Sequence, residues 1–175
     1  HVDSSAASDV YKRQFSTRPD TIFGVSFLAL SPNHPMSIGI SKENEKIKKF
    51  LEVCKESKAA EADMAKADKL GIDTGIRAMH PITKEEIPIW IGNFVLLDYG
   101  TGVVMGVPGH DSRDFEFASK YNLDIKQVIQ SDRTDDLPIL DKGILVNSDK
   151  FDGKTSEEAS KEIIQELIDN GYGEE

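Results

Sequence analysis

The stretch from Gly100 to Asp114 places the tightest limits on how this chain can fold. It reads Gly-Thr-Gly-Val-Val-Met-Gly-Val-Pro-Gly-His-Asp-Ser-Arg-Asp. The apolar run at 103–107 predicts a short buried strand, and Pro108-Gly109 predicts a tight turn. Asp111 then predicts the N-cap of a helix that runs to about Tyr121. A strand that ends in a turn delivers ionisable side chains to one place, which is how many folds build a pocket.

The polar end of this stretch has two interpretations. In the first, Asp111 caps the helix and Asp114, three residues later, completes an acidic variant of the capping box, which the positive helix N-terminus favours. In the second, side chains at a helix start beside the end of a strand bind a substrate amine or order a water molecule. The cap does not account for His110, and the residues alone leave both interpretations open.

Short strands are mixed with a few helices along the rest of the chain. The hydrophobic pattern predicts strands at 22–30, 75–79, 87–91, 94–97, 125–129 and 143–146. It predicts helices at 41–55 with Ser41 as N-cap, at 59–70, and after a capping box at 155–158. Pro88 suggests an edge strand or a strand start. Because strands and helices do not alternate strictly, the pattern favours an α+β domain or a β-barrel decorated with helices.

The bulk properties indicate one domain. The 175 residues are enough for a single core. Residues 1–14 are small and polar with no useful period, so we interpret them as a non-native or disordered leader, with a native flexible arm as the alternative. The folded domain is then expected at 15–175. Cys54 is the one cysteine, which excludes an internal disulfide framework and fits a reducing, cytoplasmic compartment.

The net charge of −10 argues against an autonomous nucleic-acid binder, because such proteins usually carry a basic field. A nucleic-acid partner is therefore expected to contribute only a few nucleotides, or to be held by something else. No apolar run approaches the ~20 residues that span a bilayer, so no membrane association is expected.

Two other chemistries find little support in the spacing. The possible metal ligands do not form any of the common metal-binding patterns, so no metal is expected; they are His34, His80, His110, Asp111 and Asp114. A hydrolase nucleophile would have to be Ser16, Thr17 or Thr21 acting with His110. No G-x-S-x-G motif is present to support that arrangement.

Two segments resemble signature motifs of the editing domain of leucyl-tRNA synthetase. Phe15 to Gly24, Phe-Ser-Thr-Arg-Pro-Asp-Thr-Ile-Phe-Gly, resembles its threonine-rich segment, and Tyr99 to Phe117 resembles its second signature. Isoleucyl and valyl relatives share a threonine-rich segment and a Gly-Thr-Gly run, but the Arg-Pro-Asp-Thr-Ile-Phe-Gly sequence and Met105 are similar to the leucyl enzyme. Further family-like sequence lies in family order at 87–91, 143–148 and 151–153, so the resemblance covers 15–175.

This resemblance implies post-transfer editing, in which a wrong amino acid is hydrolysed from the 3′ end of tRNA(Leu). The expected substrates are isoleucyl, norvalyl or methionyl esters, with leucyl-tRNA(Leu) spared. The resemblance also implies a β-barrel-like core, no cofactor, a monomer, and two partners: the tRNA 3′ end and the remainder of the synthetase. The ATP motifs of the synthetic site are not among these residues, so we expect no aminoacylation.

The roles of individual residues follow from the same resemblance. Asp114 matches the aspartate that pairs with the substrate α-amino group, and Thr21 matches the threonine whose bulk blocks leucine. Ser16 and Thr17 match hydroxyls that contact the ester or the terminal ribose and help to position water; the family usually has Thr-Thr there. The catalytic set is therefore Ser16, Thr17 and Asp114. The substrate-binding set is Thr21, Tyr99, Met105, Val107, His110, Asp111 and Arg18, of which His110 and Asp111 lie beside the site.

Two other functions remain open from the sequence. A non-catalytic module that binds tRNA or protein could have the same fold, and so could an amide or ester hydrolase unrelated to tRNA. The family motifs favour the editing hydrolase over both.

Overall fold

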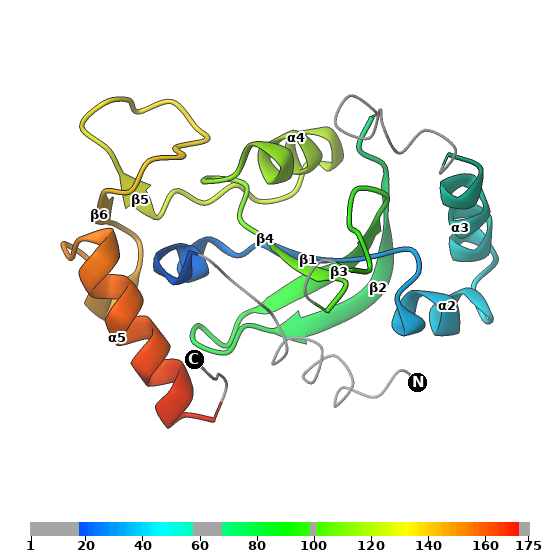
Figure 1. Cartoon of the computed structure of the whole chain (residues 1–175), viewed down its shortest axis with the longest axis horizontal. Helices are drawn as coiled ribbons and strands as arrows, with labels where there is room; N and C mark the ends of the chain where they lie inside the picture. Colours follow the sequence, from blue (N-terminus) through cyan, green and yellow to red (C-terminus); the bar gives the residue numbers. More distant parts are fainter. Residues whose placement is uncertain (1–17, 58–67, 99–100, 172–175) are drawn as a thin grey trace.

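The computed structural model describes residues 18–57, 68–98 and 101–171, and these form a mixed α+β structure (Figure 1). The predicted leader at 1–14 and most of the predicted helix at 59–70 lie outside the described residues. The elements in chain order are η1 Pro19–Gly24, β1 Phe27–Leu30, α2 Pro35–Ser41, α3 Glu45–Ser57, β2 Gly71–Met79, β3 Glu86–Gly92, β4 Val103–Gly106, α4 Ser112–Tyr121, β5 Ile129–Gln130, β6 Ile144–Leu145, η3 Asp149–Phe151 and α5 Ser156–Asp169.

The larger sheet has four strands in the order β2-β3-β1-β4. Strand β1 pairs parallel with β3 and antiparallel with β4, while β2 pairs antiparallel with β3. Strands β5 and β6 form a separate antiparallel pair. The α+β class is therefore confirmed. The described strands form an open sheet rather than a closed barrel, since β2 and β4 stand at its two edges.

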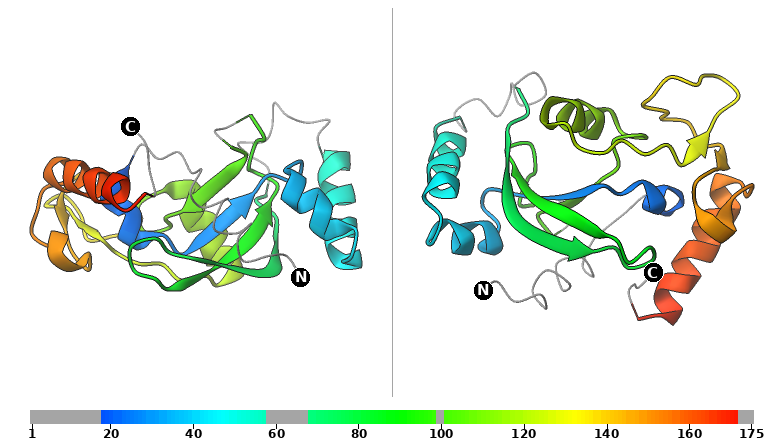
Figure 2. Two further views of the ribbon diagram at one scale, coloured as in Figure 1. Left: turned by 90° about the horizontal axis from the view of Figure 1, so that it is seen from below. Right: turned by 180° about the vertical axis from the view of Figure 1, so that it is seen from behind.

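Each face of this sheet packs into its own apolar cluster. Alternate β1 residues, Leu28 and Leu30, point into the larger cluster with side chains of α3, η1 and α5. Phe27 and Ala29 point to the other face, where Phe117 of α4 packs against them at zero exposure. Figure 2 shows α4 on one side of the sheet, with α3 and α5 near its two ends. The strict in-out alternation of a strand explains why four consecutive buried residues serve two clusters.

The helix predicted at 41–55 begins later, as α3 at Glu45, and a separate helix that was not predicted, α2, precedes it and ends at Ser41. His34 caps α2 by accepting the Met36 N–H at its Nδ1, and Pro35 occupies the first helical position, which suits a residue without an N–H. Ser41 ends α2 and is not an N-cap, so that prediction is wrong. Asn44 supplies the cap instead, because its side-chain oxygen accepts the Ile47 N–H at 3.2 Å at the start of α3.

Four strand predictions also change. The strand predicted at 22–30 begins only at Phe27, because η1 occupies the residues after Pro19. The segment 94–97 is a turn and not a strand. Pro88 lies in an interior strand, but near its start: pairing of β3 with β1 begins at Ile89, so the missing N–H costs no hydrogen bond on that side. The predicted strands at 125–129 and 143–146 shrink to β5 and β6.

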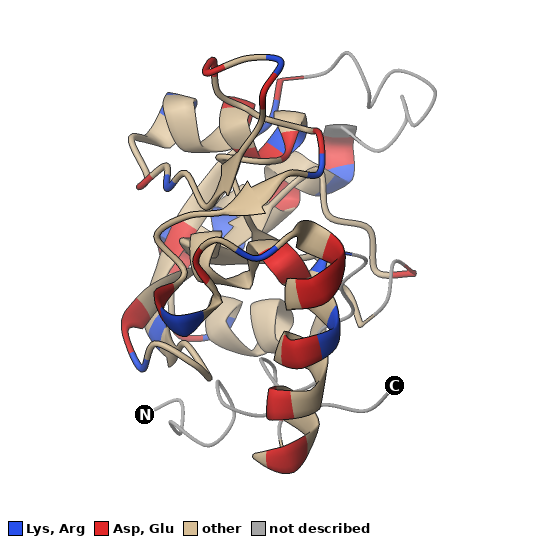
Figure 3. Cartoon of the chain, turned by 90° about the vertical axis from the view of Figure 1, so that its left-hand side faces the viewer, with Lys and Arg blue, Asp and Glu red and all other residues tan. Residues whose placement is uncertain are grey.

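Helix α5 begins as its capping box predicts, with the Thr155 hydroxyl accepting the Glu158 N–H at 3.2 Å. Its outer face is acidic (Figure 3). The acidic residues of this helix are Glu157, Glu158, Glu162, Glu166 and Asp169. Lys150 and Lys154 pair with two of them. None of the helices that the structure describes is long and apolar enough to cross a membrane.

Candidate functional site

The pairing of β1 with β4 brings the two sequence motifs together. The Ser26 N–H donates to the Gly106 carbonyl at 3.0 Å, and Phe27 lies opposite Gly106. The segment that leaves η1 therefore runs beside the end of β4. Because the strands are antiparallel, η1 and the turn that follows β4 must lie at the same end of the sheet.

Val107, which follows β4, lies close to Gly24 at the end of η1. A Cβ on Gly24 at the end of η1 would lie only 3.2 Å from Val107 Cγ1 and 3.0 Å from Val128 Cγ2, so glycine permits the close approach. Met105 and Val107 are both partly buried against the larger core cluster. These two predicted pocket-wall residues lie two positions apart, and hence on one face of the chain.

Thr21 is held in one orientation by the backbone of η1. Its hydroxyl donates to the Arg18 carbonyl at 2.9 Å, and its own N–H donates to the same oxygen at 3.1 Å. The residue is 4 % exposed. Since the hydroxyl is already bonded, the side chain provides fixed bulk rather than a free hydrogen-bond donor.

Asp20 is buried beside Thr21 and is fully partnered. Arg18 donates to its two carboxylate oxygens from Nε at 3.0 Å and Nη2 at 2.9 Å, and the same guanidinium donates from Nη1 to the Leu140 carbonyl at 3.3 Å. Burial raises the pKa of Asp20, but hydrogen bonds from Arg18 and Ser156 and the charge of Arg18 outweigh it and hold the pKa below its ordinary value. The guanidinium of Arg18, a predicted substrate contact, thus donates to groups within the protein, Asp20 and the Leu140 carbonyl.

The start of α4 confirms one half of the predicted capping box and contradicts the other. Asp111 is the N-cap, and its Oδ1 accepts the Arg113 and Asp114 N–H groups at 2.9 and 3.0 Å. The carboxylate of Asp114 does not complete the box. Its Oδ2 accepts the Val107 N–H at 2.9 Å, across the turn that joins β4 to α4.

Asp114 is a buried carboxylate with little to stabilise its charge. It is 4 % exposed. Burial and the negative charge of Asp111 raise the pKa of Asp114 to about 7, against the opposing effects of the Val107 N–H and of Arg113. In the part of the chain that the structure describes, no Lys, Arg or His forms an ion pair with it. Near neutral pH a cation that reached this carboxylate would shift it to the ionised form.

His110 is bonded to backbone groups through both ring nitrogens, to residues 128 and 129 on one side and to Ile139 on the other. Burial is the main reason that the pKa of His110 lies below its ordinary value. The ring therefore stands beside the site without a nitrogen left for a ligand. Asp111 also stands beside the site, where its charge acts on Asp114.

The sequence assigns no role near the site to Asp20 or Ser156, and it offers His80 only as a possible metal ligand; all three make buried contacts around η1 or Gly143. His80 Nε2 bonds the Ile22 carbonyl of η1 at 2.8 Å, and Ser156 Oγ accepts the Gly143 N–H at 3.0 Å. The closeness of Arg18 and Asp20 in the sequence is the local signal for their ion pair. The predicted residues Ser16, Thr17 and Tyr99 lie outside the described residues.

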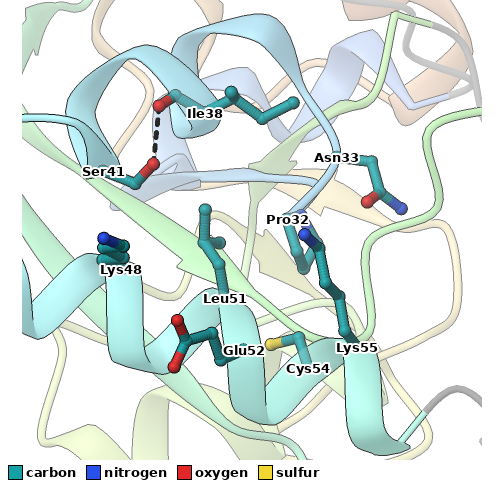
Figure 4. A pocket seen from close by; sticks show the side chains of 9 residues that line it. All are labelled: Pro32, Asn33, Ile38, Ser41, Lys48, Leu51, Glu52, Cys54 and Lys55. Carbon is teal, nitrogen blue, oxygen red and sulfur yellow. Dashed lines mark hydrogen bonds between the residues drawn. The ribbon is translucent and has the colours of Figure 1, made fainter.

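A separate hollow of about 250 Å³ lies between α2 and α3 (Figure 4). Its lining includes Pro32, Ile38, Leu51, Cys54 and Lys55. Figure 1 places these two helices at the end of the sheet away from η1 and α5. No residue of the predicted site lines it. No group of three or more His, Cys, Asp or Glu that could hold a metal occurs within 18–57, 68–98 and 101–171.

Known proteins are similar to this chain over most of its length. A family model described as leucyl-tRNA synthetase, editing domain, matches residues 5–168. A leucine–tRNA ligase from Hahella chejuensis is 51 % identical over 165 residues, which is 91 % of this chain and 19 % of that protein. One from Marinobacter nauticus is 49 % identical over 164 residues, again 91 % of this chain and 19 % of that protein.

A solved structure shares the fold. It is the ternary complex of Agrobacterium radiobacter K84 agnB2 LeuRS with tRNA and LeuAMS, with a TM-score of 0.65 and 28 % identity, covering 90 % of this chain and 17 % of that one. The chain thus spans about a fifth of the length of the relatives that it matches. The shared motifs, the family match and the common fold together show that this chain belongs to the family of leucyl-tRNA synthetase editing domains.

Proposed function

We propose that this chain hydrolyses the aminoacyl ester of mischarged tRNA(Leu) and spares leucyl-tRNA(Leu). The observation that carries the proposal is Asp114, a buried carboxylate without a cationic partner among the described residues. An aminoacyl ester carries an α-ammonium, and a buried carboxylate at a helix start is its natural charge partner. The expected substrates are isoleucyl, norvalyl and methionyl esters.

Thr21 supplies the discrimination against leucine. Its hydroxyl is fixed on the Arg18 carbonyl, so the side chain cannot easily rotate out of the way of a larger substrate. Met105 and Val107 form the opposing wall. Rejection by fixed bulk is the expected device where a site must exclude the correct product rather than recognise one wrong amino acid.

The reaction needs no protein nucleophile. A water molecule attacks the ester carbonyl, the bond between that carbon and the ribose oxygen breaks, and the free amino acid leaves with the ribose hydroxyl restored. The ester is already activated, so positioning of the water and of the ammonium is sufficient for acceleration. Ser16 and Thr17 position the water, and Asp114 orients the substrate.

The partners follow from charge and size. A chain with a net charge of −10 is suited to receiving only the single-stranded 3′ end of the tRNA. The remainder of a full-length ligase holds the rest of the tRNA, consistent with the fifth of its length that this domain represents. The domain works as a monomer in the cytoplasm.

A deacylation assay with isoleucyl-tRNA(Leu) and leucyl-tRNA(Leu) tests this function. We expect selective loss of the isoleucyl ester. Tight tRNA binding without turnover would instead identify a binding module, and hydrolysis of simple esters that ignores tRNA would identify an unrelated hydrolase.

The Thr21→Ala variant tests the pocket itself. Removing the fixed side chain enlarges the site, so leucyl-tRNA(Leu) becomes a substrate while isoleucyl-tRNA(Leu) remains one. Leucyl ester that survives this variant intact contradicts the role of Thr21. Thr74→Val is a matched control, because it removes a buried threonine hydroxyl on β2 that donates to Ile89.

A further inference from the structure

The ring of His110 occupies one tautomer that its surroundings define. The N–H groups of Val128 and Ile129 both point to Nε2, at 2.9 and 3.1 Å, so this nitrogen carries the lone pair. Nδ1 therefore carries the hydrogen and donates to the Ile139 carbonyl at 2.9 Å. Protonation of Nε2 would place its N–H against the N–H groups of Val128 and Ile129, which are also donors. For that reason the imidazole is held neutral.

His110 lies in the turn that sets the position of Asp114. The His110 N–H closes the turn on the Val107 carbonyl at 3.1 Å, and the Val107 N–H is the group that Asp114 accepts. The same turn is bonded to a second segment, since the Ile139 N–H donates to the Gly109 carbonyl at 2.9 Å.

The segment at 126–129 packs directly against this turn. A Cβ on Gly109 would lie 2.2 Å from the Lys126 carbonyl oxygen, so the two backbones are in closest contact there. The His110 ring then spans from residues 128 and 129 to Ile139, with polar atoms matched at both ends. It is 6 % exposed, which leaves no water to replace those bonds.

We propose that His110 is a positioning residue of the site, which locks the turn at 107–110 between the segments at 126–129 and 139 and thereby fixes Asp114 and Val107. It acts through backbone groups and does not touch the substrate. This inference rests on the proposed function for its effect on turnover, but its effect on Asp114 is independent of that function.

Two variants of His110 each keep one of the two sets of hydrogen bonds that the ring makes and remove the other. In His110→Gln the side-chain oxygen reaches toward the place of Nε2 and keeps the acceptor for residues 128 and 129. In His110→Asn the side-chain amide lies near the place of Nδ1 and keeps the donor to Ile139. Thr74→Val is the matched control, because Thr74 is also buried, donates to the Ile89 carbonyl at 2.6 Å and accepts the Ile76 N–H at 3.1 Å, but lies on β2.

The experiment measures single-turnover deacylation of isoleucyl-tRNA(Leu) with the chain in excess, together with thermal unfolding. We expect both His110 variants to lower the maximal rate roughly 10- to 100-fold, with a smaller change in the half-saturating concentration, because a displacement near 1 Å is enough for such a loss. Thr74→Val is expected to keep the wild-type rate at a comparable loss of unfolding temperature. Wild-type rates in both His110 variants, or an equal loss of rate in Thr74→Val, overturn the positioning role.

A second readout follows the Asp114 carboxyl by carbon NMR. Displacement of the turn changes the pKa of Asp114 in the His110 variants and leaves it unchanged in Thr74→Val. If the wild-type chain deacylates nothing, the proposed function fails and this titration alone decides the positioning role. If neither variant folds, nitrogen NMR of the wild-type ring decides it: the Nδ1–H tautomer at neutral pH supports the inference, and an imidazolium or an Nε2–H tautomer overturns it.

Discussion

The 3₁₀ helix η1 and the helix α4 each bury one carboxylate at the same end of the sheet, and the two carboxylates are opposites. Asp20 on η1 is bonded twice by the Arg18 guanidinium, and its pKa lies below the ordinary value. Asp114 on α4 accepts one backbone N–H, and its pKa is raised to about 7. Burial is common to both, so the partner makes the difference. The paired carboxylate stabilises the structure, whereas the unpaired one is the group that the proposed function assigns to the substrate ammonium.

The largest expected effect is on stability, from Asp114→Asn. The unfolded Asp114 ionises near 3.8 and the folded one near 7, so wild-type stability falls as pH rises through this window, and the cost persists above it. The amide keeps an acceptor for Val107 but carries no charge. We therefore expect the free energy of unfolding of this variant to exceed that of the wild type by on the order of 4 kcal/mol at pH 8, with little difference at pH 4. Denaturant unfolding at the two pH values measures it. Equal stability of the two proteins at both pH values contradicts the raised pKa.

The same Asp114→Asn variant is expected to lose deacylation. An amide cannot neutralise the substrate ammonium, and truncating a buried charge pair costs about 2 kcal/mol or more, which corresponds to a loss of roughly 30-fold or more in kcat/KM. The measurement is hydrolysis of isoleucyl-tRNA(Leu) at pH 8. A variant that is more stable and yet inactive separates the role of this carboxylate from structure. Full activity in a stable Asp114→Asn protein ends the ammonium assignment.

Asp20→Asn is expected to act in the opposite direction on stability. It removes a charge that Arg18 holds in a buried pair, so the free energy of unfolding falls by about 2 kcal/mol at pH 7. Because the pKa of Asp20 is lowered on folding, its contribution is present above the ordinary aspartate range and is lost as pH falls through the lowered folded pKa. Urea unfolding at pH 7 and pH 3 measures both. If Asp20→Asn leaves the pH 7 midpoint unchanged, the contrast between the two carboxylates is wrong.

The smallest expected effect comes from Asp111→Asn. Asparagine caps helices as well as aspartate does, so stability should change by no more than a few tenths of a kcal/mol. The variant removes a negative charge that helps to raise the pKa of Asp114. If Asp114 binds the substrate ammonium as proposed, deacylation requires its ionised form and rises with pH, so the midpoint of the pH–rate profile should move to lower pH. A pH–rate profile of both proteins checks the direction, and a midpoint that stays fixed shows that Asp111 has no such effect.

The sequence predicted those features that local signals determine. The N-caps Asp111 and Thr155 and the end of α4 at Tyr121 follow from local signals, and the structure confirms them. The helix α2 and its separation from α3 are not among the predictions, although His34-Pro35 and Asn44 are local signals for the two helix starts.

The candidate site depends on contacts between distant residues, and these were less predictable. Residue spacing leaves Asp114 as either a capping-box partner or a binding residue, and in the structure its carboxylate accepts the Val107 N–H instead of completing the box. Family resemblance alone placed it in a site. The bonds from His110 to residues 128, 129 and 139 link segments whose approach no local pattern encodes.

The pairing of β1 with β4 has a consequence for how the site forms in time. Phe27 and Gly106 are partners, yet α2, α3, β2 and β3 lie between them in the chain. Closing so long a loop is slow compared with forming a helix, so we expect η1 and the turn after β4 to meet late in folding. A chain whose synthesis has not passed β4 therefore lacks the neighbourhood of η1 and the turn after β4, and the proposed deacylation would report a domain that has paired these strands.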